Sequence, residues 1–159
     1  MSNTDETRPS VNDRLEMELV LTMILAKRAF TEVLRPFGVE TVEWHALQRL
    51  AETDGPSQTE LAALMLRDKV AITRLVATLV DKGLVERRSD PQDGRKQRLH
   101  LTAEATRLLP ELEAARARVA EVVEADLGEG DLAELRRIMK ILRDGYLRWL
   151  EPDPKDRRT

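Results

Sequence analysis

Four consecutive local signals in residues 57–102 restrict the fold of this chain more than any other feature of its sequence. Ser57 followed by Glu60 has the spacing of a capping box, which predicts a short helix from there to about residue 65. After a link of two residues, Asp68 can cap a longer helix, and Gly83 stands where that helix would end in a left-handed conformation. The first signals therefore predict two helices joined by a tight turn.

Two short strands are predicted after the second of these helices. The segments "LVERR" (84–88) and "QRLHLT" (97–102) flank the turn-rich loop "SDPQDGRK" (89–96), and the second segment alternates polar and apolar residues. Helix, turn, helix and hairpin in this order are typical of a winged helix-turn-helix, whose second helix enters the major groove of DNA.

The residues before this segment predict two more helices. Asn12 or Asp13 can cap the first, and Pro36 ends it. Thr41 can cap the second, with Glu43 favourable in its first turn.

After the hairpin, the sequence predicts two long helices. Thr102 begins one of them, and Pro110 should either kink it or mark a later start. Its apolar residues recur in a coiled-coil-like pattern, at Leu108, Leu112, Ala115, Val119 and Val122. Gly128 and Gly130 interrupt the chain, and Asp131 can cap the last helix.

These elements predict a mainly α fold with a small β-hairpin wing, a winged helix-turn-helix head joined to long helices. The expected divisions are a flexible tail (1–11), a head (41–102) and dimerisation helices (12–35 and 103–150). The apolar faces of the long helices exceed what so small a head could cover, and a twofold dimer is the commonest solution.

Charge is distributed unevenly along the chain. The net charge is -3, yet residues 65–100 hold nine Lys and Arg against five acids. A basic centre between acidic arms indicates a local site for a polyanion such as DNA.

Composition excludes several classes of function. There is no cysteine, which removes thiol chemistry, disulfides and thiolate metal sites, and His45 and His100 are the only two histidines. No nucleophile-base pair or phosphate loop indicates an enzyme, and no metal or cofactor is expected. Neither a membrane-spanning run nor a signal peptide is found, so we expect a cytoplasmic protein without membrane contact.

The start of the predicted second helix of the pair carries the candidate base contacts. Arg74 can bind guanine bidentately, and Lys69 can reach guanine or a phosphate. Val70 and Ala71 are small enough to let the helix lie close to DNA and can touch a thymine methyl group, and Thr73 can donate a hydrogen bond, accept one or present its methyl group.

The loop of the hairpin carries Asp93, Arg95 and Lys96. Arg95 can enter a narrow minor groove, and Asp93 can hold its guanidinium in a fixed direction. Phosphate anchors are expected at Gln58, Thr59 and Arg87 or Arg88. Taken singly, each of these charges equally fits a solvated surface residue, and the Asp-Gly pair fits a simple turn.

The segment from "TELAALML" through "ITRLV" and "DKGLVERR" to "SDPQDGR" and the final "LT" resembles the MarR family of bacterial transcription regulators. Asp93, Arg95, Leu101 and Thr102 have the family's Asp-x-Arg-x5-Leu-Thr spacing. The long flanking helices extend the resemblance to nearly the whole chain, residues 12–159, as a single MarR-like domain. Two departures are Gly94, where a second Arg is common, and the pair "VA" at 70–71, where many members have small hydroxylated residues.

The resemblance implies an intertwined homodimer on a palindromic operator, with base contacts at the start of the predicted recognition helix and Arg95 in the minor groove. It also implies a small aromatic or phenolic acid bound between head and dimer region. Candidate ligand residues are Met23, Arg28, Phe30, Trp44 and His45. Trp44 fits a core position equally, and His45 fits a surface or an interface. Because the chain lacks cysteine, a thiol-based peroxide sensor is excluded.

The sequence thus predicts a sequence-specific regulator of transcription that binds double-stranded DNA, a repressor released by a small aromatic ligand. The alternative is a winged helix used only for protein-protein contacts, which would need no cations around the helix tip and loop.

Overall fold

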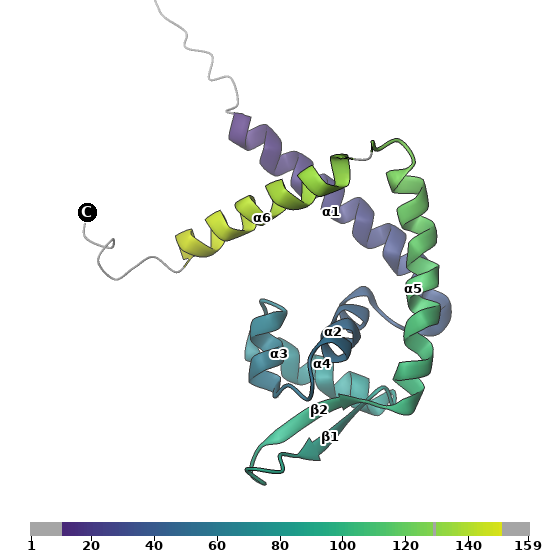
Figure 1. Ribbon diagram of the computed structural model, residues 1–159, viewed down its shortest axis with the longest axis vertical. Coiled ribbons are helices and arrows are strands. Elements are labelled where there is room, and N and C mark those ends of the chain that lie inside the picture. Colours follow the sequence, from purple (N-terminus) through teal and green to yellow (C-terminus); the bar gives the residue numbers. More distant parts are fainter. Residues whose placement is uncertain (1–10, 129, 151–159) are drawn as a thin grey trace, which may run out of the picture. The chain divides into compact units, whose positions relative to one another are not determined.

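The computed structural model describes residues 11–128 and 130–150, and these form a mainly helical protein with one antiparallel hairpin (Figure 1). The elements are α1 (Val11–Leu34), η1 (Arg35–Phe37), α2 (Thr41–Glu52), α3 (Gln58–Leu64), α4 (Lys69–Asp81), β1 (Val85–Ser89), β2 (Gln97–Leu101), α5 (Ala103–Glu124) and α6 (Asp131–Leu150). The predicted fold class is confirmed. Of the tail expected over residues 1–11, residues 1–10 lie outside the described part, and Val11 begins α1.

The predicted signals for the helix pair are present as hydrogen bonds. The Ser57 hydroxyl accepts the Glu60 N–H at 3.2 Å, and the Glu60 carboxylate accepts the Ser57 N–H at 2.7 Å. Asp68 accepts the Ala71 N–H at 2.8 Å and so caps α4. Gly83 follows α4 with φ +69°, a conformation that glycine adopts without steric cost.

The hairpin pairs Val85 with Leu101 and Ser89 with Gln97. Its base is fixed to the head by Thr102, whose hydroxyl donates to the Gly83 carbonyl at 2.7 Å and accepts the Ala105 N–H at 3.2 Å. The same residue therefore closes the hairpin and caps α5.

One hydrophobic core holds the head together, from the end of α1 to the first half of α5. Its largest fully buried side chains include Leu34, Leu47, Leu61, Ile72, Val76, Leu79, Val85, Leu99 and Leu112. Part of the apolar seam predicted for α5 is covered by its own chain, because Leu112 and Ala115 are buried, whereas Val122 is exposed.

Four predictions at helix ends are corrected. Asn12 and Asp13 lie inside α1 rather than before it. Glu40, not Thr41, precedes α2, and its N–H donates to Glu43 at 2.7 Å. The later start considered at Pro110 is wrong, because α5 continues through it from Ala103.

The fourth correction is at α6, which begins at Asp131 instead of after it. The Asp131 carboxylate accepts the Gly128 N–H and so reaches back over the turn.

The chain divides into two compact units, one ending at Val119 and the other beginning at Ala120. The second unit contains the last turn of α5 and the whole of α6, on which large apolar residues such as Leu135, Ile138 and Trp149 are exposed. In the described part of the chain, no helix is both long and apolar enough to span a bilayer.

Candidate nucleic-acid interface

Helix α4 presents its first turns to solvent while its opposite face is fixed in the core. Lys69, Thr73 and Arg74 are exposed, and Ala71 is half-buried. Val70 is 61% exposed, which is unusual for a β-branched apolar residue and leaves its methyl groups free for contact. Ile72 lies in the core between these residues. The packing of one face therefore determines which side chains the other face presents.

The Thr73 hydroxyl is already engaged. It lies 3.2 Å from the Gln58 side-chain oxygen and 2.8 Å from the Lys69 carbonyl, and it donates toward these acceptors. Thr73 is therefore left with its methyl group and an acceptor lone pair for any partner. Gln58, predicted as a phosphate anchor, joins α3 to α4 through this bond, and Thr59 beside it is exposed.

The wing shows a different arrangement from the one that we expected for Asp93. Asp93 accepts the backbone N–H of Arg95 at 3.2 Å and forms an ion pair with Lys96 at 3.5 Å. Asp93 thus shapes the loop and holds Lys96, and the prediction that it holds the Arg95 guanidinium is wrong. The reason is geometric, since the turn brings the backbone of Arg95 to Asp93 and sends its side chain outward.

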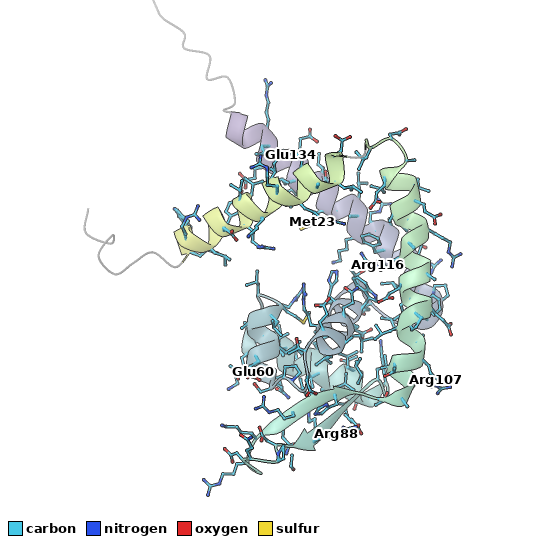
Figure 2. The ribbon with its side chains drawn as sticks, in the orientation of Figure 1. Met23, Glu60, Arg88, Arg107, Arg116 and Glu134 are labelled. Carbon is cyan, nitrogen blue, oxygen red and sulfur yellow. The ribbon has the colours of Figure 1, made fainter. Side chains whose placement is uncertain are left out.

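Some cations of the interface are paired with a carboxylate and others are not. On the hairpin, Arg88 (labelled in Figure 2) pairs with Glu86. Within residues 11–128 and 130–150, no side-chain hydrogen bond or ion pair is found for four exposed cations on α4 and the hairpin: Lys69, Arg74, Arg87 and Arg95. Because most other cations of the head have carboxylate partners, these four are the charges on α4 and the hairpin that are available to an anion.

A second cluster lies where α1, α2 and α5 pack, and it contains a residue, Arg116, that no pattern in the sequence indicates. The Arg116 guanidinium carbon lies 3.4 Å from the ring centroid of Trp44 and 4.1 Å from that of Phe30. The Trp44 and His45 rings lie 5.0 Å apart. The structure thus brings Phe30, Trp44 and His45 together, and Figure 2 shows Arg116 on α5 at this place.

Two donors of this cluster are buried without an acceptor. Trp44 is 4% exposed, and within the described residues neither its Nε1 nor the Nε of Arg116 has a hydrogen-bond partner. Burial lowers the pKa of Arg116 from its usual value. The pKa of His45 is also lowered, first by burial and then by the positive charges of Arg116, Arg49 and Arg67. This electropositive cluster is suited to an anion or a hydrogen-bond acceptor.

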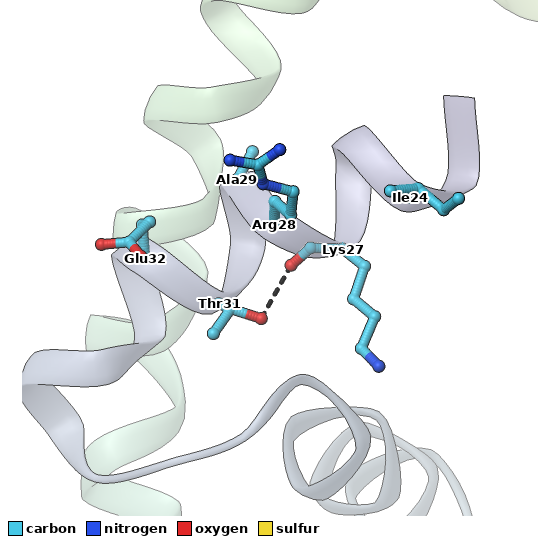
Figure 3. Close-up of a pocket in the computed structure, with 6 residues that line it drawn as sticks. All are labelled: Ile24, Lys27, Arg28, Ala29, Thr31 and Glu32. Carbon is cyan, nitrogen blue, oxygen red and sulfur yellow. Dashed lines mark hydrogen bonds between the residues drawn. The ribbon is translucent and has the colours of Figure 1, made fainter. Parts of the chain in front are cut away.

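The other two ligand candidates lie in different surroundings. Met23 lines a hollow of about 800 Å³ with residues of α1, Glu40, Thr41, Val42 and Arg67. Arg28 lines an open hollow along one face of α1, next to Lys27 and Thr31 (Figure 3). The sequence could not show that Met23 and Arg28 lie apart from Phe30, because all three residues belong to the same helix.

Arg116 carries no signal in the sequence, where it is one of many charged residues on a long helix. Only the packing of α5 against α1 and α2 places it between two rings. In the described residues, no group of three or more His, Asp or Glu side chains could hold a metal ion.

Comparison with known proteins agrees with this geometry. The sequence model of the MarR family matches residues 39–96. A protein of Thauera aromatica named as a transcriptional regulatory protein for the hcr operon is 31% identical over 134 residues, which cover 84% of this chain and 81% of the relative.

Solved structures agree on the fold. A MarR transcriptional regulator from Methanosarcina mazei superimposes with a TM-score of 0.76 at 22% identity, covering 86% of this chain and 98% of that one. MepR of S. aureus, solved as a complex with DNA, has a TM-score of 0.71 at 18% identity, covering 86% and 96%. The match to the family model and the 31% identity to the Thauera aromatica protein agree with the winged helix and its exposed cations. The chain belongs to the MarR family of non-enzymatic, DNA-binding transcriptional regulators.

Proposed function

We propose that this protein represses transcription by binding a palindromic operator in double-stranded DNA. The observation that carries the proposal is a group of four exposed cations at the start of α4 and on the hairpin. None of the four has a side-chain partner among the described residues. Arg74 would bind guanine in the major groove, and Arg95 would enter the minor groove.

The neighbouring residues have supporting roles in this proposal. Lys69 and Arg87 would bind guanine or phosphate, and Val70 and Ala71 would contact thymine methyl groups. Thr73, whose hydroxyl is engaged within the head, would contribute mainly its methyl group.

The test is operator affinity of Arg74→Ala and Arg95→Ala, after selection of bound sequences from a random duplex pool. Loss of a bidentate base contact costs about 1 to 3 kcal/mol, so Arg74→Ala should weaken binding roughly 5- to 150-fold. Arg107→Ala, which breaks an exposed ion pair with Glu104 on α5, is the matched control and should leave affinity unchanged.

Three outcomes bear on the proposal. Unchanged affinity in both variants would show that Arg74 and Arg95 do not contact the operator. A complete lack of salt-sensitive DNA binding would instead favour the winged helix as a protein-contact module. Repression is checked with a reporter gene behind the selected operator, whose expression should fall when the protein is present.

We further propose that the active form is a homodimer. Large apolar residues are exposed in α1, such as Leu21 and Leu25, and in α6, such as Ile138 and Trp149. A second copy of the chain is the partner that fits, because a dimer presents two α4 helices to the two halves of a palindrome.

The effector proposal rests on the cluster around Arg116. A carboxylate would accept from the buried Nε1 of Trp44 and Nε of Arg116, and an aromatic ring would pack on Phe30 or Trp44. A small aromatic acid satisfies both requirements, and its binding here would loosen the hold on DNA by changing how α5 packs on α2.

Tryptophan fluorescence tests this directly. In Trp149→Phe protein, Trp44 is the remaining tryptophan, and 2-hydroxybenzoate should quench its emission and lower operator affinity. Cyclohexanecarboxylate, which has the charge without the aromatic ring, should act more weakly. Quenching without any change in DNA affinity would contradict the regulatory role, and equal quenching in Arg116→Met would contradict the site.

A further inference from the structure

Arg98 on β2 joins three parts of the head through one guanidinium group. Its Nε donates to the Asp90 carboxylate at 2.6 Å, and its Nη1 donates to Glu60 at 3.0 Å and to the Gly55 carbonyl at 3.3 Å. Asp90 begins the wing loop, Glu60 lies in the first turn of α3, and Gly55 lies in the turn before it. Charge-assisted bonds of this kind are among the stronger polar contacts in proteins.

Asp90 in turn organises the wing loop. Its side chain is 8% exposed, and its second oxygen accepts the N–H groups of Gln92 at 2.8 Å and Asp93 at 3.3 Å. These bonds, the one from Gln92 first and then the one from Arg98, lower the pKa of Asp90. The chain of contacts continues from Asp93 to the Arg95 N–H.

The first turn of α3 links the wing to the recognition helix. Glu60 binds Arg98 of the hairpin, while Gln58, two residues earlier, accepts from Thr73 of α4. Ser57 holds this turn in place through the capping box. Polar contacts therefore lead from the Arg95 N–H on the wing to Glu60 and from Gln58 to Thr73 on α4, and the first turn of α3 joins the two sets.

We propose that the Asp90–Arg98–Glu60 cluster is a positioning device that sets the place of Arg95 relative to α4, and so determines whether both grooves of DNA are contacted together. The inference rests on the proposed DNA-binding role of Arg95. None of these three residues needs to touch DNA. Their contribution is to hold the wing loop in the conformation that binding requires. The loop then loses its conformational entropy when the protein folds and not when it binds DNA.

Asp90→Asn separates positioning from electrostatics because the two predict opposite signs. Removal of a negative charge beside a polyanion would by itself tighten binding. The amide, however, cannot accept from Gln92, Asp93 and Arg98 together without turning its NH₂ group toward a donor. We expect weaker operator binding, by roughly tenfold, within the range of coupling in one hydrogen-bond network.

A double-mutant cycle with Arg95→Ala tests whether the effect passes through Arg95. If it does, Asp90→Asn should weaken wild-type protein but have little further effect on Arg95→Ala. Hydroxyl-radical footprinting should show lost protection in the flanking minor groove, with guanine N7 protection in the major groove retained. Arg107→Gln serves as the control for a lost surface ion pair.

The outcomes are distinct. Unchanged or tighter binding by Asp90→Asn overturns the inference, as does a loss that adds fully to that of Arg95→Ala. If Arg95→Ala alone has no effect, the proposed role of the wing fails instead. Should Asp90→Asn not fold by circular dichroism, Glu60→Gln, which keeps the capping box, decides by the same cycle.

Discussion

Leu66 lies in the turn between α3 and α4 in a conformation that suits glycine. Its φ is +51°, and its side chain is 66% exposed. For an L-amino acid other than glycine, this left-handed region costs about 1 to 2 kcal/mol. Because the side chain is exposed, few packing contacts offset that cost, and the left-handed conformation is required by the turn between the two helices.

Leu66→Gly should therefore stabilise the head. The gain from relieved strain, less the larger entropy that glycine loses on folding, amounts to about 0.5 to 1 kcal/mol. Chemical denaturation measures it as a higher midpoint with an unchanged slope. Leu64→Gly, in the last turn of α3, is the control and should be destabilising by about 1 kcal/mol. A destabilised Leu66→Gly would show that the side chain packs usefully.

His45 makes stability depend on pH. Its pKa is lower in the folded protein than in the unfolded chain, because burial and the charges of Arg116, Arg49 and Arg67 disfavour its protonation. Its contribution is fully present above the unfolded pKa, near 6.5, and declines as pH falls from there through the folded value.

His45→Gln should flatten the decline of the melting temperature between about pH 7 and pH 5, since glutamine does not titrate there. The measurement is thermal unfolding by circular dichroism across this range. His100→Gln is the control, and an equal flattening in both variants would assign the dependence elsewhere.

At the scale of elements, α4 is fixed at both ends. Its first turn has the Asp68 cap, and beyond its last turn the Lys82 ammonium lies 2.7 Å from both oxygens of Glu43 and from the Gly38 carbonyl. Glu43 is almost fully buried at the start of α2. This ion pair links the recognition helix to the junction of α1 and α2.

Lys82→Met should destabilise the head by about 3 kcal/mol, because a buried carboxylate would be left without its cation. Replacing both partners, as in Lys82→Met with Glu43→Leu, should recover much of the loss, since the unpaired charge is then gone. Denaturant titration of the four proteins of this cycle provides the coupling energy. Additive losses would show that the two groups do not act as a pair.

Most elements could be predicted because their signals are local. Ser57, Asp68, Gly83 and Thr102 each act on backbone groups within a few residues, so pattern and structure agree. The sequence predicts Thr41 as the cap of α2, because Thr is a more favourable cap residue than Glu. In the structure the cap is Glu40, whose N–H donates to the Glu43 carboxylate, so α2 starts one residue earlier.

At the scale of the whole molecule, the exposed apolar residues of α1 and α6 call for a partner. Trp149 is 79% exposed, more than a large aromatic ring is expected to be in an isolated protein.

Trp149→Asp should weaken the proposed dimer by roughly 30-fold or more, the effect of losing an interface residue worth at least 2 kcal/mol. Sedimentation velocity over a concentration series measures this, and operator affinity should fall with it because a single head makes half of the contacts. Arg148→Gln, at the preceding position, makes the net charge more negative by the same one unit and is the control for that change. Equal shifts in both variants would indicate that Trp149 lies outside the interface.

The sequence by itself determined the helix-turn-helix, the hairpin and the cations at its tip, because these depend on caps, turn residues and spacing within about 45 residues. Tertiary structure alone decided which of those cations stay unpaired, why Asp93 holds Lys96 instead of Arg95, and how Arg98 joins α3 to the wing. It also placed Arg116 between Phe30 and Trp44, from three separate helices. The physical reason is that caps and turns are satisfied by neighbours in sequence, whereas the partner of a long charged side chain is chosen by whatever packing brings within its reach.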